Sequence, residues 1–500
     1  MVSLTAVVAY HARVTPDREA LLYGEGRLSY AQLLARVETA AGLLQARGIH
    51  PGQVVALLMK NSSAFIELSL AISHVGAVLL PINYRLGAEE VAYILQHAEA
   101  ALLFVDAELR EAAGGFADIV EVDEAAQSDS MLLAPTVEPC RVPHPSRPGD
   151  LFRLMYTSGT TDRPKGVMHS YENYHWKCLD HIAALGLSAA DRLLVVGPLY
   201  HVGAFDLPGL AVLTVGGLLA VQREFDVESA LLVIDREKLT GAWMAPVMLN
   251  RALAFGRREL DLSSLRWVIG GGERTPEDRI RQFGLLFPKA RYIDAYGLTE
   301  TCSGDTFMEA GREIEKIGST GRALAHVQIE VCDDEGRPLP AGEVGEICVR
   351  GPKVTKGYLK DPAKTRESFH GEWFRTGDVG YLDAEGFLFL TDRKKDMIIS
   401  GGENIASSEV ERVLYQLPQV VEAAAIGLPD ATWGERVTAV VVLRAGTSLT
   451  LDQLRAHCEG RLGGFKTPKQ LILRDDLPRN PSGKVLKRVL RSEFATGATQ

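Results

Sequence analysis

A run of small and hydroxylated residues that ends in a lysine is the strongest sign of chemistry in this sequence. Residues 156–167 read YTSGTTDRPKGV. Backbone N–H groups and hydroxyls in such a run can wrap phosphate oxygens, and Lys165 can neutralise phosphate charge. A Walker A loop is excluded, because Pro164 stands where a glycine is required and Gly166 follows the lysine. The segment predicts a phosphate-binding loop, with a polar surface turn as the alternative.

A second segment, DAYGLTET at 294–301, follows a predicted strand. Ligands of parallel α/β sheets bind at the carboxyl ends of strands. There, Tyr296 can stack on a planar base, Thr299 can donate to a phosphate, and Glu300 can bind Mg²⁺ through its carboxylate. The alternative is a capped helix start, where Thr and Glu are common.

Two further segments give weaker evidence of a ligand site when each is taken alone. FRTGDV at 374–379 predicts a turn whose Asp378 accepts hydrogen bonds from two ribose hydroxyls, although Asp after Gly is also an ordinary turn residue. NPSGKVLKR at 480–488 places Lys484 on a glycine-containing tip, where most lysines are simply solvated.

Elements that can position these segments alternate along the chain. Ser29–Gly48 predicts a helix that begins with a Ser29–Gln32 capping box, and Gln53–Met59 predicts a buried strand. Strands are also predicted at 191–196, 265–269 and 291–295, and helices at 226–237 and 277–287. The alternation predicts an α/β fold with largely parallel sheets covered by helices.

The last hundred residues predict a small α+β domain. The charged segment Thr391–Asn404 is interpreted as a junction rather than as core, so we divide the chain into domains 1–394 and 395–500. Predicted helices are 408–417 and 451–462, and predicted strands are 422–426, 437–443 and 469–473.

Composition narrows the class of protein. With 46% hydrophobic residues, 24% charged residues and a net charge of −10, the chain is typical of a globular protein without an extended nucleic-acid surface. We expect no signal peptide and no membrane span, since the N-terminus lacks a basic and apolar leader and the apolar stretch 207–221 is interrupted by glycines. Six scattered cysteines without a CxxC pair favour a cytoplasmic location.

In their order and spacing, the four segments resemble the adenylate-forming superfamily of acyl-CoA synthetases, peptide-synthetase adenylation domains and beetle luciferases. The resemblance runs from Leu28–Leu33 to Lys484 and is strongest to the fatty-acyl and feruloyl-type branch, including DMIISGGEN at 396–404. It implies an ATP-dependent acid:CoA ligase that forms an acyl-AMP and pyrophosphate, then transfers the acyl group to CoA and releases AMP. ATP, Mg²⁺ and coenzyme A are the implied co-substrates and metal.

The resemblance also implies residue roles. Lys484 serves adenylation, Lys395 is the hinge of a mobile small domain, and Gly401 and Gly402 face the thiol once the domain has rotated. Glu300 binds Mg²⁺, and Thr299 contacts the α-phosphate. Nucleotide-binding positions are Thr157, Ser158, Gly159, Thr160, Thr161, Lys165, Gly271, Gly272, Asp294, Tyr296, Gly297, Asp378 and Arg393. Asp162 and Glu273–Arg274 depart from the family pattern, which usually has Gly and Ala-Pro there.

PLYHVGAFDL at 198–207 matches the family segment that forms one wall of the acyl pocket. His201 is implied as its gating aromatic residue, with a satisfied core histidine as the alternative. Peptide-synthetase domains place an amino-group ligand at the position of His201, and Asp206 comes too late to replace it, so an amino-acid substrate is not expected. The remaining implied wall residues favour a fatty, aryl or polycyclic acid: Val202, Ala204, Phe205, Trp243, Met244, Gly270 and Gly271.

Three alternatives stay open at this point. The acyl group can pass to a carrier-protein thiol, although few residues follow Lys484 and no carrier segment is expected. A luciferase-like oxygenase shares these motifs. A non-catalytic binding protein of the same fold is expected to have lost Lys484, Glu300 or Asp378, and all three are present. The sequence also leaves open whether the protein is a homodimer.

Overall fold

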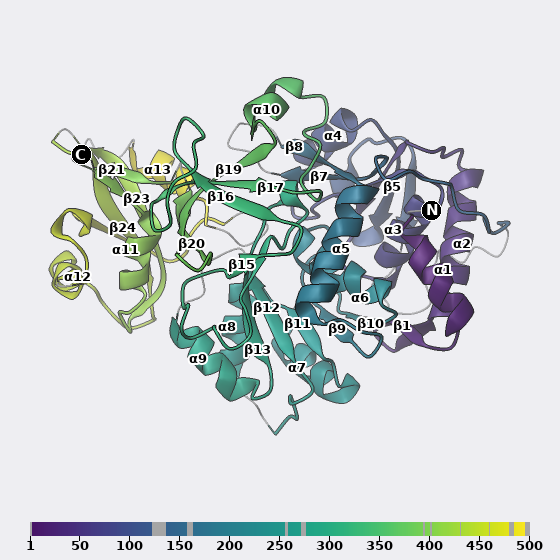
Figure 1. The fold of residues 1–500 in the computed structure, drawn as a ribbon, viewed down its shortest axis with the longest axis horizontal. Coiled ribbons are helices and arrows are strands. Elements are labelled where there is room, and N and C mark those ends of the chain that lie inside the picture. Colours follow the sequence, from purple (N-terminus) through teal and green to yellow (C-terminus); the bar gives the residue numbers. More distant parts are fainter. Residues whose placement is uncertain are drawn as a thin grey trace. The chain divides into compact units, whose positions relative to one another are not determined.

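The computed structural model describes residues 3–122, 137–157, 164–255, 259–271, 277–393, 396–400, 403–430, 432–459, 461–479 and 485–495 (Figure 1). The chain forms two compact units. Unit 1 comprises Met1–Ile329 and Val349–Phe374, and unit 2 comprises Glu330–Cys348 and Arg375–Gln500.

The larger sheet of unit 1 has nine strands among the described residues, in the order β15-β14-β13-β12-β11-β9-β10-β1-β2. The six strands from β13 to β1 are parallel, and the outer strands pair antiparallel. The bounds are β1 (Glu19–Tyr23), β2 (Gly26–Ser29), β9 (Arg192–Val195), β10 (Leu218–Val221), β11 (Gly241–Trp243), β12 (Trp267–Gly271), β13 (Arg291–Tyr296), β14 (Thr306–Phe307) and β15 (Arg322–Ala323).

Three helices bury their apolar stripes against this sheet: α7 (Val227–Glu237), α8 (Pro246–Phe255) and α9 (Glu277–Leu286). Leu231 and Ile234 of α7 pack in one cluster with Val268 of β12 and Phe283 of α9. The side chain of Asp226 caps α7 by accepting the Ser229 N–H at 2.9 Å. The predicted strands and helices of this region are confirmed to within a few residues.

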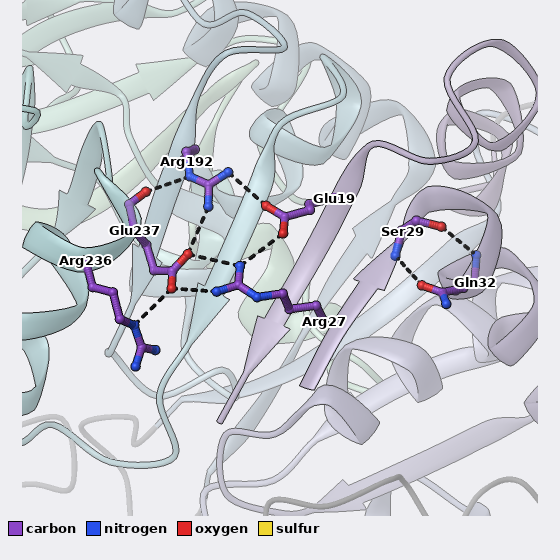
Figure 2. A network of polar contacts seen from close by, with 7 residues as sticks. All are labelled: Glu19, Arg27, Ser29, Gln32, Arg192, Arg236 and Glu237. Atoms are coloured by element: carbon purple, nitrogen blue, oxygen red, sulfur yellow. Dashed lines mark hydrogen bonds and ion pairs between the residues drawn. The ribbon is translucent and has the colours of Figure 1, made fainter. Parts of the chain in front are cut away.

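An ion network joins the end of α7 to the strands of this sheet (Figure 2). The Glu237 carboxylate accepts from Arg27 of β2 at 2.7 Å and from Arg192 of β9 at 3.2 Å. Arg236 also donates to it, at 3.0 Å. Glu19 of β1 completes the network by accepting from Arg27 and Arg192, each at 3.0 Å.

The second sheet of unit 1 has the order β6-β5-β3-β4-β7-β8 and is parallel except for the β7–β8 pair. The predicted helix at 29–48 is α2 (Tyr30–Ala46), and its Ser29–Gln32 capping box is present (Figure 2). The other bounds are β3 (Val54–Leu58), β4 (Val78–Pro81), β5 (Ala100–Asp106), β6 (Ile119–Val122), β7 (Leu151–Thr157), β8 (Lys165–Ser170), α1 (Thr5–Val14), α3 (Ser63–His74), α4 (Ala88–His97), α5 (Tyr171–Leu185) and α6 (Leu210–Thr214).

A third sheet contains β16, β17, β19 and β18 in that order, with β20 paired to β19. The turn predicted at 374–379 is wrong, because these residues lie inside β19. Within this strand Gly377 has φ +72°, a region that glycine enters without strain, and the β19–β20 register shifts between Val379 and Gly380. The bounds are β16 (Gln328–Cys332), β17 (Gly345–Arg350), β18 (Phe369–His370), β19 (Trp373–Leu382), β20 (Leu388–Arg393) and α10 (Pro362–Glu367).

Unit 2 contains the predicted α+β arrangement. Its sheet has the order β22-β21-β24-β23, with β25 paired to β24. The interpretation of 391–404 as non-core is wrong in its second half, since Ile398 is fully buried in the unit's core. The bounds are β21 (Ile398–Ser400), β22 (Glu403–Ile405), β23 (Val420–Asp430), β24 (Gly434–Leu443), β25 (Gln470–Arg474), α11 (Ser407–Leu414), α12 (Leu451–Cys458) and α13 (Lys487–Ala495).

No helix within the described residues has the length and apolar character that crossing a bilayer requires. All six cysteines are unpaired.

Candidate active site

The two ends of the predicted phosphate loop are held together by a strand pair. Thr157 ends β7 and Lys165 begins β8, and the two residues face each other in the antiparallel ladder. Side chains of α4 contact both flanks: Tyr156 Oη lies 2.7 Å from His97 Nδ1, and Tyr93 Oη donates to Pro164 O at 3.4 Å. Ser158, Gly159, Thr160, Thr161 and Asp162 lie outside the described residues.

Tyr358 brings Lys165 and Glu300 to one place. Its hydroxyl donates to Glu300 Oε1 at 3.0 Å, and Lys165 Nζ lies 5.9 Å from the centroid of its ring. Tyr358 also pairs with Val167 of β8 in a single antiparallel bridge. Burial first, and the negative charge of Glu300 second, raise the pKa of the Tyr358 hydroxyl, so it stays protonated and can donate.

Thr299 and Glu300 lie in a short 3-10 turn, Thr299–Thr301, beyond the carboxyl end of β13. The Thr299 carbonyl lies 2.7 Å from His169 Nε2 of β8, and the Glu300 carbonyl accepts the Thr355 N–H at 2.7 Å. Desolvation by burial, followed by the charge of Arg153, lowers the pKa of His169 to about 3. His169 is therefore neutral at physiological pH and holds the turn as a hydrogen-bond donor.

The residues predicted to frame the adenine come from neighbouring strands. Asp294 is in register with Gly270, and Ala295 with Gly271, across the parallel β12–β13 pair. Asp294 and Tyr296 are both buried. Gly297 follows β13, and a Cβ there would collide with the backbone nitrogen of Gly304, so only glycine fits. Gly272, Glu273 and Arg274 lie outside the described residues.

The two residues predicted to bind ribose stand opposite each other within unit 2. Asp378 of β19 and Arg393 of β20 are partners in the antiparallel ladder. Asp378 is buried, and its N–H donates to Thr376 Oγ1 at 3.1 Å. The side chain of Arg393 lies outside the described part, so the shared ribose contact stays a prediction.

The implied acyl wall is apolar. Val202, Phe205 and Met244 are buried, and Trp243 lies against Gly203, where an added Cβ would fall 2.6 Å from Trp243 Cζ2. His201 Nδ1 accepts the Gly203 N–H at 3.2 Å. Burial lowers the pKa of His201, so the imidazole is neutral. The side chain of Ala204 is outside the described part.

Asp206, the one carboxylate of the wall segment η2 (Val202–Gly209), is fully buried. It accepts from Arg153 Nη1 at 2.8 Å and lies 3.3 Å from Lys177 Nζ. Burial acts to raise the pKa of this carboxyl, but Arg153 and Lys177 outweigh burial and hold it below its usual range. Asp206 is thus an ionised partner of two internal cations.

Lys395, Gly401, Gly402 and Lys484 lie outside the described residues, so their roles stay predictions. Their flanks are described. Ser400 pairs with Glu403 on either side of the two glycines, and Arg479 bridges to Val485 on either side of 480–484.

Sequence reasoning missed Tyr358, Arg153 and His169. KGVMHS places His169 four residues after Lys165, and alternation along β8 is a signal that it shares the face of Lys165. No sequence signal connects Tyr358 to Glu300, because the two are 58 residues apart and meet only through folding.

The chain resembles known proteins over most of its length. The family model described as AMP-binding enzyme matches residues 8–359, and that of the AMP-binding enzyme C-terminal domain matches residues 409–484. A feruloyl-CoA synthase of Amycolatopsis sp is 37% identical over 489 residues, covering 97% of both chains. A long-chain-fatty-acid–CoA ligase of Mycobacterium tuberculosis is 36% identical over 486 residues, covering 94% of this chain and 93% of that one.

A solved relative has been captured with nucleotide ligands. The o-succinylbenzoate CoA synthetase of Bacillus subtilis, in complex with its acyl-adenylate, has a TM-score of 0.87 and 31% identity, covering 97% of both chains. The same enzyme with ATP and a magnesium ion has a TM-score of 0.87 and 30% identity, covering 96% of this chain and 98% of that one. The chain therefore belongs to the AMP-binding enzyme family, and it is an AMP-forming acid:CoA ligase that uses ATP, Mg²⁺ and coenzyme A.

Proposed function

We propose that this ligase activates a hydrophobic carboxylic acid and that the residues described above divide the work of two half-reactions. In the first, a carboxylate oxygen attacks the α-phosphorus of ATP, and the bond to pyrophosphate breaks. In the second, the sulfur of CoA attacks the acyl carbonyl, and AMP leaves. The observation that carries the residue roles is the meeting of Lys165, Tyr358 and Glu300 at the mouth of the phosphate loop.

The first half-reaction brings two anions together, so its barrier falls where cations and donors surround the α-phosphate. We assign Lys165 to the β- and γ-phosphates, Thr299 to the α-phosphate, and Lys484 to the space between carboxylate and phosphate. The strand pair between Thr157 and Lys165 supports the first assignment, since it fixes the lysine at the loop's end.

Mg²⁺ fits the Glu300 site by its chemistry. Among the residues described, no three His, Cys, Asp or Glu side chains converge as a metal cage. Mg²⁺ commonly binds through one or two carboxylates plus substrate phosphates, with water completing the shell, and one ordered carboxylate beside a phosphate loop meets that need. When bound, the ion offsets charge on the departing pyrophosphate. Tyr358 holds the carboxylate by one oxygen.

The residues of the proposed acyl wall indicate which class of carboxylic acid is the substrate. Val202, Phe205 and Met244 supply buried apolar surface, and Asp206 is already engaged by Arg153 and Lys177 rather than offered to a ligand amine. The relatives named for feruloyl and long-chain fatty acyl groups act on acids of this kind. We therefore propose a fatty, aryl or polycyclic acid, with neutral His201 at the gate.

Rotation of a C-terminal domain beginning near Lys395 is proposed to separate the half-reactions. It would withdraw Lys484 and present Gly401 and Gly402 to the thiol. The division at 394 and 395, a homodimer, a carrier-protein acceptor and the cytoplasmic location also stay predictions. The six unpaired cysteines support the last of these.

Measuring the half-reactions separately tests the proposal. ATP–pyrophosphate exchange across fatty, aryl and polycyclic acids reports adenylation, and thioester formation from preformed acyl-AMP reports the second step. Lys484→Ala should abolish exchange and largely spare thioester formation. Lys487→Ala is the matched control, because Lys487 Nζ pairs with Glu411 at 2.8 Å, and it should leave the ratio of the two rates unchanged. Equal losses of both half-reactions in Lys484→Ala would refute the assignment.

A further inference from the structure

A continuous chain of buried polar side chains connects the acyl wall to the Thr299–Glu300 turn. Asp206 accepts from Arg153 Nη1 at 2.8 Å, and Arg153 Nη2 lies 3.0 Å from His169 Nδ1. His169 Nε2 lies 2.7 Å from the Thr299 carbonyl oxygen. Arg153 is 3% exposed, and His169 and Asp206 are 0% exposed, so solvent does not compete for these bonds.

The partners of His169 fix its tautomer. The Arg153 guanidinium has only N–H donors, with Nε at 3.3 Å and Nη2 at 3.0 Å from Nδ1, so Nδ1 must accept. A carbonyl oxygen only accepts, so Nε2 carries the proton and donates to Thr299. The imidazole ring therefore links the Arg153 guanidinium to the backbone of the turn, so a change in the position of Arg153 would change the hydrogen bond to the Thr299 carbonyl.

Asp206 determines where the Arg153 guanidinium lies. An unpaired guanidinium in the interior is strongly unfavourable, so Arg153 must follow the carboxylate that neutralises it. That carboxylate comes directly after Phe205 in η2, the segment whose apolar side chains form the proposed acyl wall. A shift of η2 when the pocket is filled would therefore act on Arg153 through Asp206.

The far end of the chain reaches the nucleotide side. The Thr299 carbonyl belongs to the peptide that leads into Glu300, whose own carbonyl and carboxylate are held by Thr355 N–H and Tyr358 Oη. His169 adds a hold on this turn that is linked through Arg153 to Asp206 of the acyl wall.

We propose that Asp206, Arg153 and His169 are positioning residues that couple occupancy of the acyl pocket to nucleotide binding at the Thr299–Glu300 turn. The inference rests on the proposed function, because it assumes that the acid lies against η2. The coupling is reciprocal: acid tightens nucleotide binding by the same factor as nucleotide tightens acid binding.

Calorimetry with α,β-methylene-ATP measures this coupling without turnover. An acid first identified by ATP–pyrophosphate exchange is added at saturation, and the Kd of the analogue is compared with and without it. Absence of exchange with any acid would count against the proposed function and would be known before this step. The wild-type protein should bind the analogue about tenfold more tightly with acid. An unchanged Kd overturns the coupling.

Variants at both ends then test the chain as a unit. His169→Leu and Asp206→Asn should each bring the ratio of the Kd values without and with acid close to one, whatever the Kd of each variant without acid. The double variant should lose no more than either single variant, since linked residues are non-additive. Additive losses, or an unchanged ratio in a folded single variant, overturn the proposal.

Circular dichroism would detect a substitution that disturbs folding. Two more variants distinguish such an effect from a loss of positioning. His169→Gln retains an amide donor for the Thr299 carbonyl and should restore part of the coupling. His74→Gln alters another buried histidine of unit 1, whose Nδ1 lies 3.3 Å from Thr5 Oγ1, and should keep the wild-type ratio. Equal loss in His74→Gln would show a general packing effect and overturn the positioning role.

Discussion

The hydroxyl of Tyr358 donates to the carboxylate of Glu300 at 3.0 Å, across 58 residues of sequence. The bond occupies Oε1 and fixes the rotamer of a side chain that is only half-buried. A carboxylate with one oxygen held is preorganised for a cation or a phosphate-bound ion, because less side-chain freedom is lost on binding.

Tyr358→Phe tests this relationship. Removal of the hydroxyl should raise the Mg²⁺ concentration for half-maximal ATP–pyrophosphate exchange by about tenfold, since a hydrogen bond to a charged group contributes roughly 1.5–3 kcal/mol. The KM for the acid should change little. Tyr171→Phe is the control, because it removes a buried hydroxyl that lies 2.8 Å from Ser73 Oγ. An unaltered Mg²⁺ dependence in Tyr358→Phe would show that the bond does not position Glu300.

Gly203→Ala tests the acyl wall. The new methyl would fall 2.6 Å from Trp243 Cζ2, so the indole, a side chain of the proposed acyl wall, must move. We expect the KM for bulky acids to rise by about tenfold or more, with the KM for ATP unchanged. Gly284→Ala on α9 is the control, because nothing lies within 4 Å of the added Cβ. Identical acid preferences in Gly203→Ala and the wild type would place the acid elsewhere.

The buried neutral His169 should make the stability of the fold decrease at low pH. The pKa of His169 is about 3 in the folded protein, whereas its ordinary value, which applies to the unfolded chain, is 6.5. As the pH falls, the unfolded chain therefore takes up the proton first. The stability that neutral His169 contributes is complete above pH 6.5 and is lost as pH falls from there towards 3. The free energy of unfolding should therefore drop by roughly 1 kcal/mol more per pH unit in the wild type than in His169→Gln over that window.

Urea unfolding at a series of pH values measures this slope. His74, His97, His181 and His201 also have lowered pKa values, but they contribute equally to both proteins and cancel in the difference. Replacement of the exposed His370 by Gln should leave the wild-type slope unchanged. If the free energy of unfolding had the same pH dependence in the wild type and in His169→Gln, His169 would titrate alike in the folded and unfolded states.

Glu237→Ala tests the ion network of Figure 2. Its side chain is 6% exposed, and its loss leaves Arg27, Arg192 and Arg236 without their shared carboxylate. We expect the free energy of unfolding to fall by about 1–3 kcal/mol, and by less in high salt. Glu335→Ala, which removes an exposed pair with Arg337, should cost at most about 1 kcal/mol. Equal effects of the two substitutions would show that the network is no stronger than a surface pair.

Local chemistry made several elements predictable. Ser29 and Gln32 encode the cap of α2, and Asp226 encodes that of α7, because capping partners are three residues apart at most. The run at 291–295 predicted the parallel strand that carries Asp294 and ends, in the structure, at Tyr296. The strand around Asp378 was mistaken for a turn because Gly377 takes φ +72° inside a ladder, and short sequence windows cannot distinguish these contexts.

By itself, the sequence determined the family, through the order of its motifs, and predicted two site segments: a phosphate loop ending in Lys165 and the Thr299–Glu300 pair after a strand. These are properties of residue type and short spacing, which need no tertiary contact to be read. The tertiary structure alone decided which side chains support them. Tyr358 meets Glu300, and Arg153 links Asp206 to His169, only because distant strands pack together and buried polar groups must find partners there.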